Sequence, residues 1–288
     1  MERRGTVAAL MPVLRQGIAT LVLAVLVVVT IVALPAYSGL EELAWPGRVW
    51  RILSHVAQGQ LPEASAVTRS AQLYTDLPTL VMRSTVLVVG AMSLALLIAL
   101  PIGIAAATKP SDQRRRAIAR VAITLSSMPA IMWATVLLLA SLKLQVSLTT
   151  DPTLALCAAM ATLVLGDRLV GDLIARVESA TKELLDEPYL RTVRASGFHV
   201  VRHLAQGLVP PVADAVASRT LFLIGGAIVV ERLFDIRGLG FRVFESLEAN
   251  PLERELVVVC TIGLVFLGVL VRAGATGAAM LADGRRRA

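Results

Sequence analysis

The chain has 288 residues, of which 56% are apolar, and its mean hydropathy is +0.73. Six long apolar runs, each near the roughly 20 residues that cross a bilayer, are typical of a polytopic membrane protein and exclude a string of soluble domains. The net charge of +7 would suggest nucleic acid in a soluble protein, but here the basic residues lie mainly in loops, which favours a lipid bilayer and no nucleic acid as the partner.

The first predicted element is a transmembrane helix over residues 13–34. Basic residues precede it, as in a signal peptide, but the apolar run is longer than a usual signal core and Pro35 disfavours cleavage. We therefore expect a retained helix, with a cleaved signal as the alternative. A polar segment follows at residues 35–78. Within it, residues 45–56 are predicted to form a helix that either packs on the outer face of the protein or lies at the membrane interface, where its two tryptophans would suit the headgroup level.

Two apolar runs predict the next transmembrane helices. The second span opens near Pro78, placed at its first turn, and runs to about Ala107. The third span covers about residues 117–142 and contains Ser126-Ser-Met-Pro129. A break of this kind leaves backbone groups without helical partners, which is tolerated in a membrane only where the helix faces protein or a water-filled path.

The fourth span starts near Thr153 and is strongly apolar only as far as Leu165. Four charged residues follow: Asp167, Arg168, Asp172 and Arg176. Ionisable residues inside a membrane indicate a functional site by default. The alternative is a cytoplasmic helix end, where neighbours four residues apart along the helix form ion pairs with one another.

Residues 187–210 form a polar, basic stretch between apolar runs. It predicts two short helices broken at Gly197, because glycine adopts the positive φ of a sharp turn. Pro210 is placed at the first turn of the next helix, where its missing N–H costs nothing. His199 and His203 are four residues apart, a spacing that could bind a metal, but no third ligand lies nearby and we expect no metal site.

Spans five and six are predicted over about residues 210–230 and 255–275, joined by an outer loop at 231–254. Arg219 falls in the middle of span five, where an unpaired charge is expensive, so we expect it to face an acid or an aqueous cavity. Residues 276–288 form a basic tail. Both termini are placed in the cytoplasm of a multi-pass protein of the cell membrane, because that orientation puts most basic loops inside.

The polar stretch resembles the cytoplasmic coupling loop of ABC importer permeases, in which a Gly and a Pro stand at a fixed spacing. Gly197 and Pro210 keep that spacing, and the pattern Tyr189-x-Arg191-Thr192-x-Arg194-Ala195-x-Gly197 resembles the dipeptide/oligopeptide/nickel branch of that family. Three residues depart from the family's pattern, where Ala, Lys and Ile are usual: Val193, Ser196 and Gly207.

A second stretch, residues 225–240, resembles the same branch. It has two glycines, an apolar run, Glu231, and then Gly238-Leu-Gly240. Arg237 stands where Pro is usual. The two stretches occur in the family's order, and the chain resembles an ABC importer permease well over about residues 77–275 and more loosely over the first 76 residues.

The resemblance implies an all-α membrane protein of six transmembrane helices, with the type I ABC importer permease fold and a cytoplasmic coupling helix. It divides the chain into an N-terminal helix with an extracytoplasmic segment (1–76), a permease core (77–275) and the basic tail, with the coupling loop at about 177–209. The implied partners are a second permease subunit, two ABC ATPase subunits and an extracytoplasmic substrate-binding protein. ATP and Mg²⁺ are expected on the ATPase subunits, and no cofactor on this chain.

The resemblance also implies that a short helix at about residues 195–198 docks on the ATPase. The predicted ATPase-coupling residues are Glu187, Tyr189, Arg191, Arg194, Ala195, Ser196, Gly197, Phe198 and Pro210. Four charged residues are predicted on the translocation path: Asp167, Arg168, Arg219 and Glu231.

The sequence contains no Gly-x4-Gly-Lys-Ser/Thr phosphate loop, no Gly-x-Ser-x-Gly elbow and no His-Glu-x-x-His motif. We therefore expect a transport subunit without catalytic residues, which imports a peptide, nickel chelate or similar small solute. Two alternatives remain open. One is an ion-coupled secondary transporter that uses its intramembrane charges, and the other is a degenerate permease that acts as a scaffold.

Overall fold

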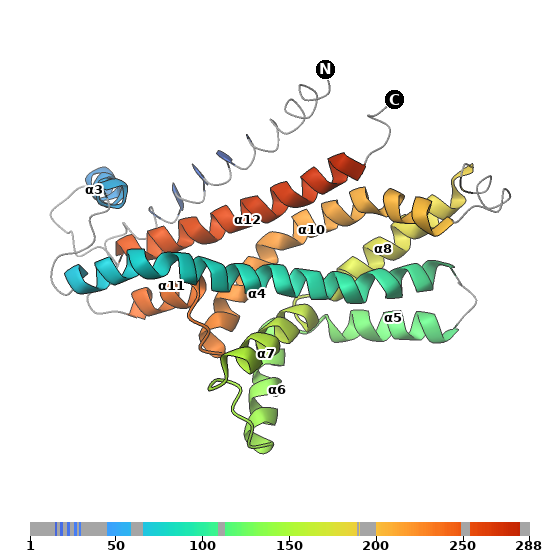
Figure 1. Cartoon of the computed structure of the whole chain (residues 1–288), viewed down its shortest axis with the longest axis horizontal. Coiled ribbons are helices and arrows are strands. Elements are labelled where there is room, and N and C mark those ends of the chain that lie inside the picture. The colour runs from blue at the N-terminus through green and yellow to red at the C-terminus, as the bar shows by residue number, and fades with distance from the viewer. Residues whose placement is uncertain are drawn as a thin grey trace. The chain divides into compact units, whose positions relative to one another are not determined.

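The computed structural model describes residues 45–58, 66–108, 113–188, 190, 200–248 and 254–282, together with eight isolated positions between 15 and 29. Apart from short turns, these residues are helical (Figure 1). The elements are α3 (Trp45–Gln58), α4 (Ala66–Thr108), α5 (Gln113–Leu125), α6 (Ala130–Lys143), α7 (Pro152–Leu165), α8 (Leu169–Asp186), α10 (Val200–Leu233), α11 (Leu239–Glu248) and α12 (Arg254–Ala282).

Three helices in the described part are long and apolar enough to cross a membrane, within Asp76–Thr108, Leu204–Leu233 and Leu256–Met280. Two bent pairs, α5 with α6 and α7 with α8, raise the number to five if each pair is one span. These five segments correspond to predicted spans two to six. The predicted first span, residues 13–34, lies largely outside the described residues, so the sixth span stays a prediction.

Two prolines do not begin helices as predicted, and one predicted loop contains a helix. The second span, predicted from near Pro78 to about Ala107, agrees with the apolar segment Asp76–Thr108, but its helix, α4, begins at Ala66, so Pro78 does not lie in the first turn. α10 runs without interruption from Val200 to Leu233, so Pro210 lies inside it, next to Pro211, and not at its first turn. A proline removes one helical hydrogen bond, and packing on both sides of it keeps the helix continuous. The predicted outer loop at 231–254 also contains a helix, α11.

The chain divides into two compact units, which are described separately: Met1–Val86 with Ala227–Val269, and Leu87–Gly226 with Leu270–Ala288. In the first unit, α3 packs through Ile52, which is 1% exposed, against Val29, Val257 and Val258. These contacts support the packed alternative for this helix. Trp50, by contrast, is 74% exposed.

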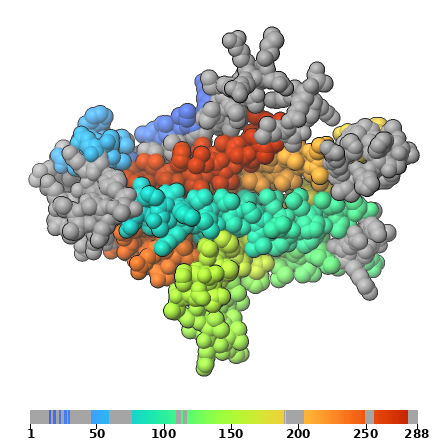
Figure 2. Space-filling view, viewed as in Figure 1, coloured from blue at the N-terminus to red at the C-terminus, as the bar shows by residue number. Residues whose placement is uncertain are grey.

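In the second unit, α6 pairs with α7 and α5 pairs with α8. The chain bends by 90° between α5 and α6 and by 52° between α7 and α8, so the α6–α7 hairpin turns away from the α5–α8 pair (Figure 1). Figure 2 shows the side chains of this hairpin as one yellow-green surface. Several of its large apolar residues are exposed, including Leu139 at 60% and Leu142 at 74%, as expected for helices that face lipid or a partner subunit.

Candidate functional site

Two helix breaks lie against each other in the second unit: Ser126–Pro129, between α5 and α6, and Gly166–Arg168, between α7 and α8. We call them the double break. The amide of Asp167 donates to the Met128 carbonyl at 3.0 Å, and the amide of Arg168 donates to the Ser126 carbonyl at 2.6 Å. In return, the Ala130 amide donates to Asp167 Oδ1 at 3.1 Å. Each broken span thus supplies the backbone partners that the other lacks, as an irregular segment in a membrane requires.

The double break depends on close approach and on strained backbone. A Cβ atom built on Gly166 would lie 2.5 Å from Ala130 Cα and 2.7 Å from Ala130 Cβ, so only glycine fits. Asp167 and Arg168 follow with φ of 52° and 63°, in the left-handed region that non-glycine residues rarely adopt. Strain of this kind persists where surrounding bonds fix it, and it often occurs at functional sites.

The lengths of the helices indicate where the double break lies along the spans. α6 and α7 have 14 residues each, or about 21 Å at the usual rise per residue. That is shorter than the roughly 30 Å of a bilayer's hydrocarbon core. If each bent pair crosses the membrane as one span, the double break therefore lies inside that span.

Two ion pairs tie α8 to α10. Arg219 on α10 pairs with Asp172 on α8, and Arg176 on α8 pairs with Asp214 on α10 at 3.2 Å. The predicted ion pairs within one helix, Arg168 with Asp172 and Asp172 with Arg176, are replaced by these pairs between helices. Arg219 thus meets an acid of its own chain, which offsets the cost of its charge in span five.

Arg219 also lines a hollow beside the double break. The hollow is lined by Leu163, Asp167, Leu169, Arg219, Phe222 and Leu223. The Arg219 guanidinium carbon lies 5.6 Å from the centroid of the Phe222 ring, within cation–π range. The acid Asp167, the base Arg219 and the ring of Phe222 therefore line the same apolar-walled hollow. Asp167 is also exposed at the surface, as is its neighbour Arg168.

We predict that Arg219→Leu lowers thermal stability and impairs transport, because it leaves Asp172 without its ion-pair partner. The side chains are 30% and 35% exposed, so the loss is expected to be about 1–3 kcal/mol in the free energy of unfolding. Thermal melting of the purified subunit measures it. The double variant Arg219→Leu/Asp172→Asn should melt closer to the wild type than Arg219→Leu alone. Equal melting of both variants would mean that the pair does not couple the two helices.

The base of the predicted coupling loop is packed on both sides. Ala180 on α8 forms a buried cluster with Leu204 and Leu208 on α10, and partly buried Leu184 and Val212 pack against it. This cluster extends on both sides of the two prolines, which explains why α10 stays helical through them.

Of the predicted ATPase-coupling residues, two have described side chains. Glu187 caps the end of α8, where its amide donates to the Leu184 carbonyl at 3.1 Å, and Pro210 is exposed on α10. The other seven, Tyr189, Arg191, Arg194, Ala195, Ser196, Gly197 and Phe198, lie outside the described residues.

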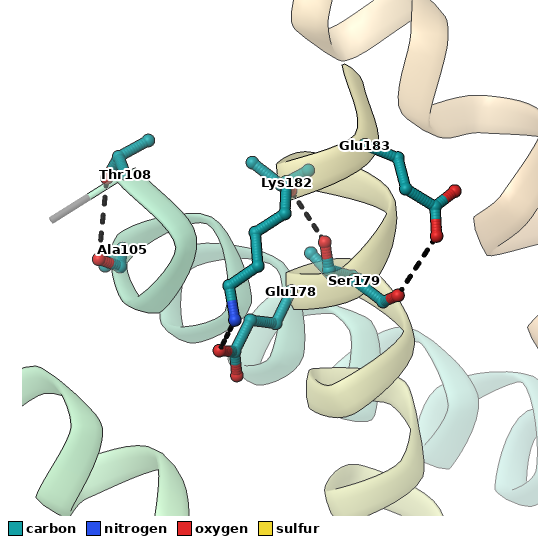
Figure 3. A network of polar contacts seen from close by, with 8 residues as sticks. Ala105, Thr108, Glu178, Ser179, Lys182 and Glu183 are labelled. Atoms are coloured by element: carbon teal, nitrogen blue, oxygen red, sulfur yellow. Dashed lines mark hydrogen bonds and ion pairs between the residues drawn. The ribbon is translucent and has the colours of Figure 1, made fainter. Parts of the chain in front are cut away.

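The last turns of α8, which lead into this loop, carry a polar face (Figure 3). Lys182 Nζ donates to Glu178 Oε1 at 2.6 Å, and Ser179 Oγ donates to Glu183 Oε1 at 3.2 Å. One ion pair between residues four apart thus occurs on α8, but nearer its end than the sequence predicts. At the end of α4, the Thr108 hydroxyl donates to the Ala105 carbonyl at 3.4 Å.

Glu231, the fourth residue predicted on the translocation path, is fully buried in the first unit. The Ser84 hydroxyl donates to Glu231 Oε1 at 2.6 Å, and the Phe241 amide donates to Oε2 at 3.0 Å. The Leu239 amide donates to Ser84 Oγ at 2.8 Å. These bonds connect α4, the end of α10 and the start of α11, and they lend no support to a place on the path, which stays a prediction.

Sequence reasoning found the break at Ser126–Pro129 but missed its partner at Gly166–Arg168. The only local signal was the glycine that ends an apolar run just before Asp167. It also missed Ser84, whose hydroxyl joins Glu231 to the Leu239 amide. No motif marks a serine inside an apolar helix as the partner of a distant acid.

Comparison with known proteins covers both the double break and the coupling stretch. The profile of one family, described as binding-protein-dependent transport system inner membrane component, matches residues 99–276. The chain is 25% identical over 233 residues to the glutathione transport system permease protein GsiC of Pectobacterium atrosepticum, which covers 78% of this chain and 76% of that protein. It is 28% identical over 235 residues to the protein of the same name from Salmonella paratyphi A, covering 77% and 74%. The family profile matches more than half of the chain, which therefore belongs to the inner membrane components of binding-protein-dependent transport systems, the permease subunits of ABC importers.

Proposed function

We propose that this subunit forms part of the translocation path of an ATP-driven importer, together with a second permease subunit. Two ATPase subunits bind ATP and Mg²⁺ on the cytoplasmic side, and an extracytoplasmic binding protein delivers the solute. Both termini lie in the cytoplasm. The observation that carries the proposal is the family match over residues 99–276, which includes the coupling stretch and the double break. The solute class is a peptide, a nickel chelate or a small peptide-like molecule such as glutathione, the solute in the names of the relatives.

The proposed mechanism couples ATP-driven movement of the loop at about 177–209 to the double break. The loop docks on the ATPase through the short helix around Gly197, a helix-in-groove contact. Its two flanking helices, α8 and α10, are joined by the buried cluster around Ala180 and by two ion pairs, so they are expected to move together. Movement of α8 would then change the backbone at Gly166–Arg168, where the chain bends by 52°.

Gly197→Val tests the coupling step. A branched residue at a turn with positive φ is strained by about 1–2 kcal/mol and adds bulk where the loop would meet the ATPase. We expect the variant to insert and to pair with the second permease, but to recover less ATPase in a pull-down and to show less solute-stimulated ATP hydrolysis. Equal ATPase recovery, with unchanged ATP hydrolysis and transport, would contradict the assignment of the coupling loop.

A suitable control for this variant is Gly277→Val on α12. A Cβ atom at Gly277 meets nothing within 4 Å, whereas one at Gly171 would collide with Ser126 Oγ and lie 3.2 Å from Ile123 Cα.

The energy source of uptake distinguishes this function from the two alternatives. Uptake that survives ATP depletion while an ion gradient persists would indicate a secondary transporter, and ATP hydrolysis without uptake would indicate a scaffold.

A further inference from the structure

The charged side chains at and beside the double break differ in whether they have a hydrogen-bond or ion-pair partner. Asp167 accepts a hydrogen bond from the amide at the start of α6, at 3.1 Å. Arg219 is paired with Asp172 and lies over Phe222. The Arg168 side chain is exposed, and within the described ranges its guanidinium has neither an ion pair nor a hydrogen bond.

The backbone, and not a side-chain partner, holds Arg168 in this position. Its amide donates to the Ser126 carbonyl at 2.6 Å, and its carbonyl accepts from the Asp172 amide at 2.9 Å. Its φ of 63° is costly for a residue with a Cβ atom. The fold therefore presents an uncompensated guanidinium in a strained conformation, at a break that lies inside the span if α7 and α8 cross as one. A charge at such a depth requires a counter-charge or water.

We propose that Arg168 binds the carboxylate of the solute as it passes the double break. A guanidinium binds a carboxylate through two parallel hydrogen bonds, which gives orientation as well as attraction. The neighbouring hollow, with Leu163, Phe222, Asp167 and Arg219, has space for one water molecule at most, so the solute would meet Arg168 on its exposed side and not inside the hollow. The proposal rests on the proposed transport function and adds to it the solute class, a molecule with a free carboxylate.

The first test measures glutathione uptake by the complete complex in proteoliposomes, expressed as solute moved per ATP hydrolysed. Arg168→Gln is expected to lower this ratio about tenfold, the equivalent of about 1.4 kcal/mol, with assembly and ATP hydrolysis retained. Arg168→Lys keeps the charge but not the two parallel hydrogen bonds, so its ratio should fall between those of Arg168→Gln and the wild type. Arg168→Gly relieves the backbone strain but removes the charge, so it should fail like Arg168→Gln. The matched control is Arg237→Gln, another exposed arginine, which should transport normally.

The second test measures binding to Arg168 directly and does not depend on transport. Phenylglyoxal modifies guanidinium groups, and mass spectrometry of the assembled complex gives the rate at Arg168. The rate is expressed relative to that at Arg237, because the thiol of glutathione or of its ester adds to phenylglyoxal and slows the reaction at every arginine. Millimolar glutathione is expected to lower this ratio, whereas glutathione diethyl ester, whose carboxylates are blocked, should leave the ratio unchanged. Arg237 should react at the same rate in both cases.

Each other outcome overturns the proposal in an identifiable way. Equal protection by glutathione and its ester would show that Arg168 does not select a carboxylate. Loss of permease pairing in Arg168→Gln, or no labelling of Arg168 in the complex, would show that it pairs with an acid of the second permease. Protection that varies with the anionic lipid content and not with glutathione would show that it binds lipid phosphate. Failure of the transport proposal is separate, because it would abolish ATP-dependent uptake in the wild type while leaving carboxylate protection of Arg168 intact.

Discussion

Gly166→Ala is expected to prevent stable folding of the second unit. The added Cβ atom would lie 2.5 Å from Ala130 Cα, 2.7 Å from Ala130 Cβ and 2.8 Å from Ala130 N. Two of these contacts are with main-chain atoms at the start of a helix and the third is with a Cβ atom, so none of them can be relieved by rotating a side chain. Separation of the two breaks would also lengthen the three hydrogen bonds that join them. We expect a loss of about 3 kcal/mol, combining overpacking with weakened buried hydrogen bonds.

The loss is measured as the fraction of monodisperse protein in size-exclusion chromatography and as the melting temperature. Gly225→Ala is the control, because a Cβ atom there meets nothing within 4 Å. Adding Ala130→Gly to Gly166→Ala removes the contact with Cβ but not the contact with Cα, so it should restore stability only in part. A melting temperature of Gly166→Ala within about 1 °C of the wild type would show that the double break is not closely packed.

The sequence predicts the spans well because the hydrophobic signal is local. Three apolar runs correspond to helices that can each cross a membrane, two more correspond to the bent pairs, and Ser126-Ser-Met-Pro129 correctly predicts a break. The break itself, however, is stabilised by Asp167 and Arg168, which lie far away in the sequence. Periodicity and turn chemistry cannot report a pairing of this range.

Charge pairing was predicted with the right residues and the wrong partners. Asp172 and Arg176 were expected to pair along one helix, where the spacing is visible in the sequence. In the structure both pair with α10, because α8 and α10 pack together through the cluster around Ala180. The continuous helix through Pro210 has the same origin, since packing on both sides of the prolines outweighs their local preference.

Glu231→Ala is expected to destabilise the first unit by about 4 kcal/mol, because it leaves buried polar groups without partners and opens a cavity. The Ser84 hydroxyl and the Phe241 amide would each lose their acceptor. The turn before α11 also packs closely on the same carboxyl group, since a Cβ atom at Gly238 would lie 2.5 Å from Glu231 Oε2. Glu231→Gln should lose less, because its amide oxygen can still accept one of the two hydrogen bonds while its NH₂ group cannot accept the other.

Thermal melting measures the loss of stability, and hydrogen exchange at residues 239–248 locates it at α11. Glu248→Ala is the matched control. Its carboxylate pairs with Arg232 at 2.7 Å, but the side chains are 59% and 41% exposed, so its removal should cost about 0–1 kcal/mol. The same experiment decides between the two roles of Glu231. If the residue holds α4, α10 and α11 together, stability and exchange change first and transport falls only as folded protein is lost. If Glu231→Gln instead melts like the wild type and exchanges normally but transports poorly, the carboxylate acts on the solute, and the sequence-based placement of Glu231 on the translocation path is the correct one.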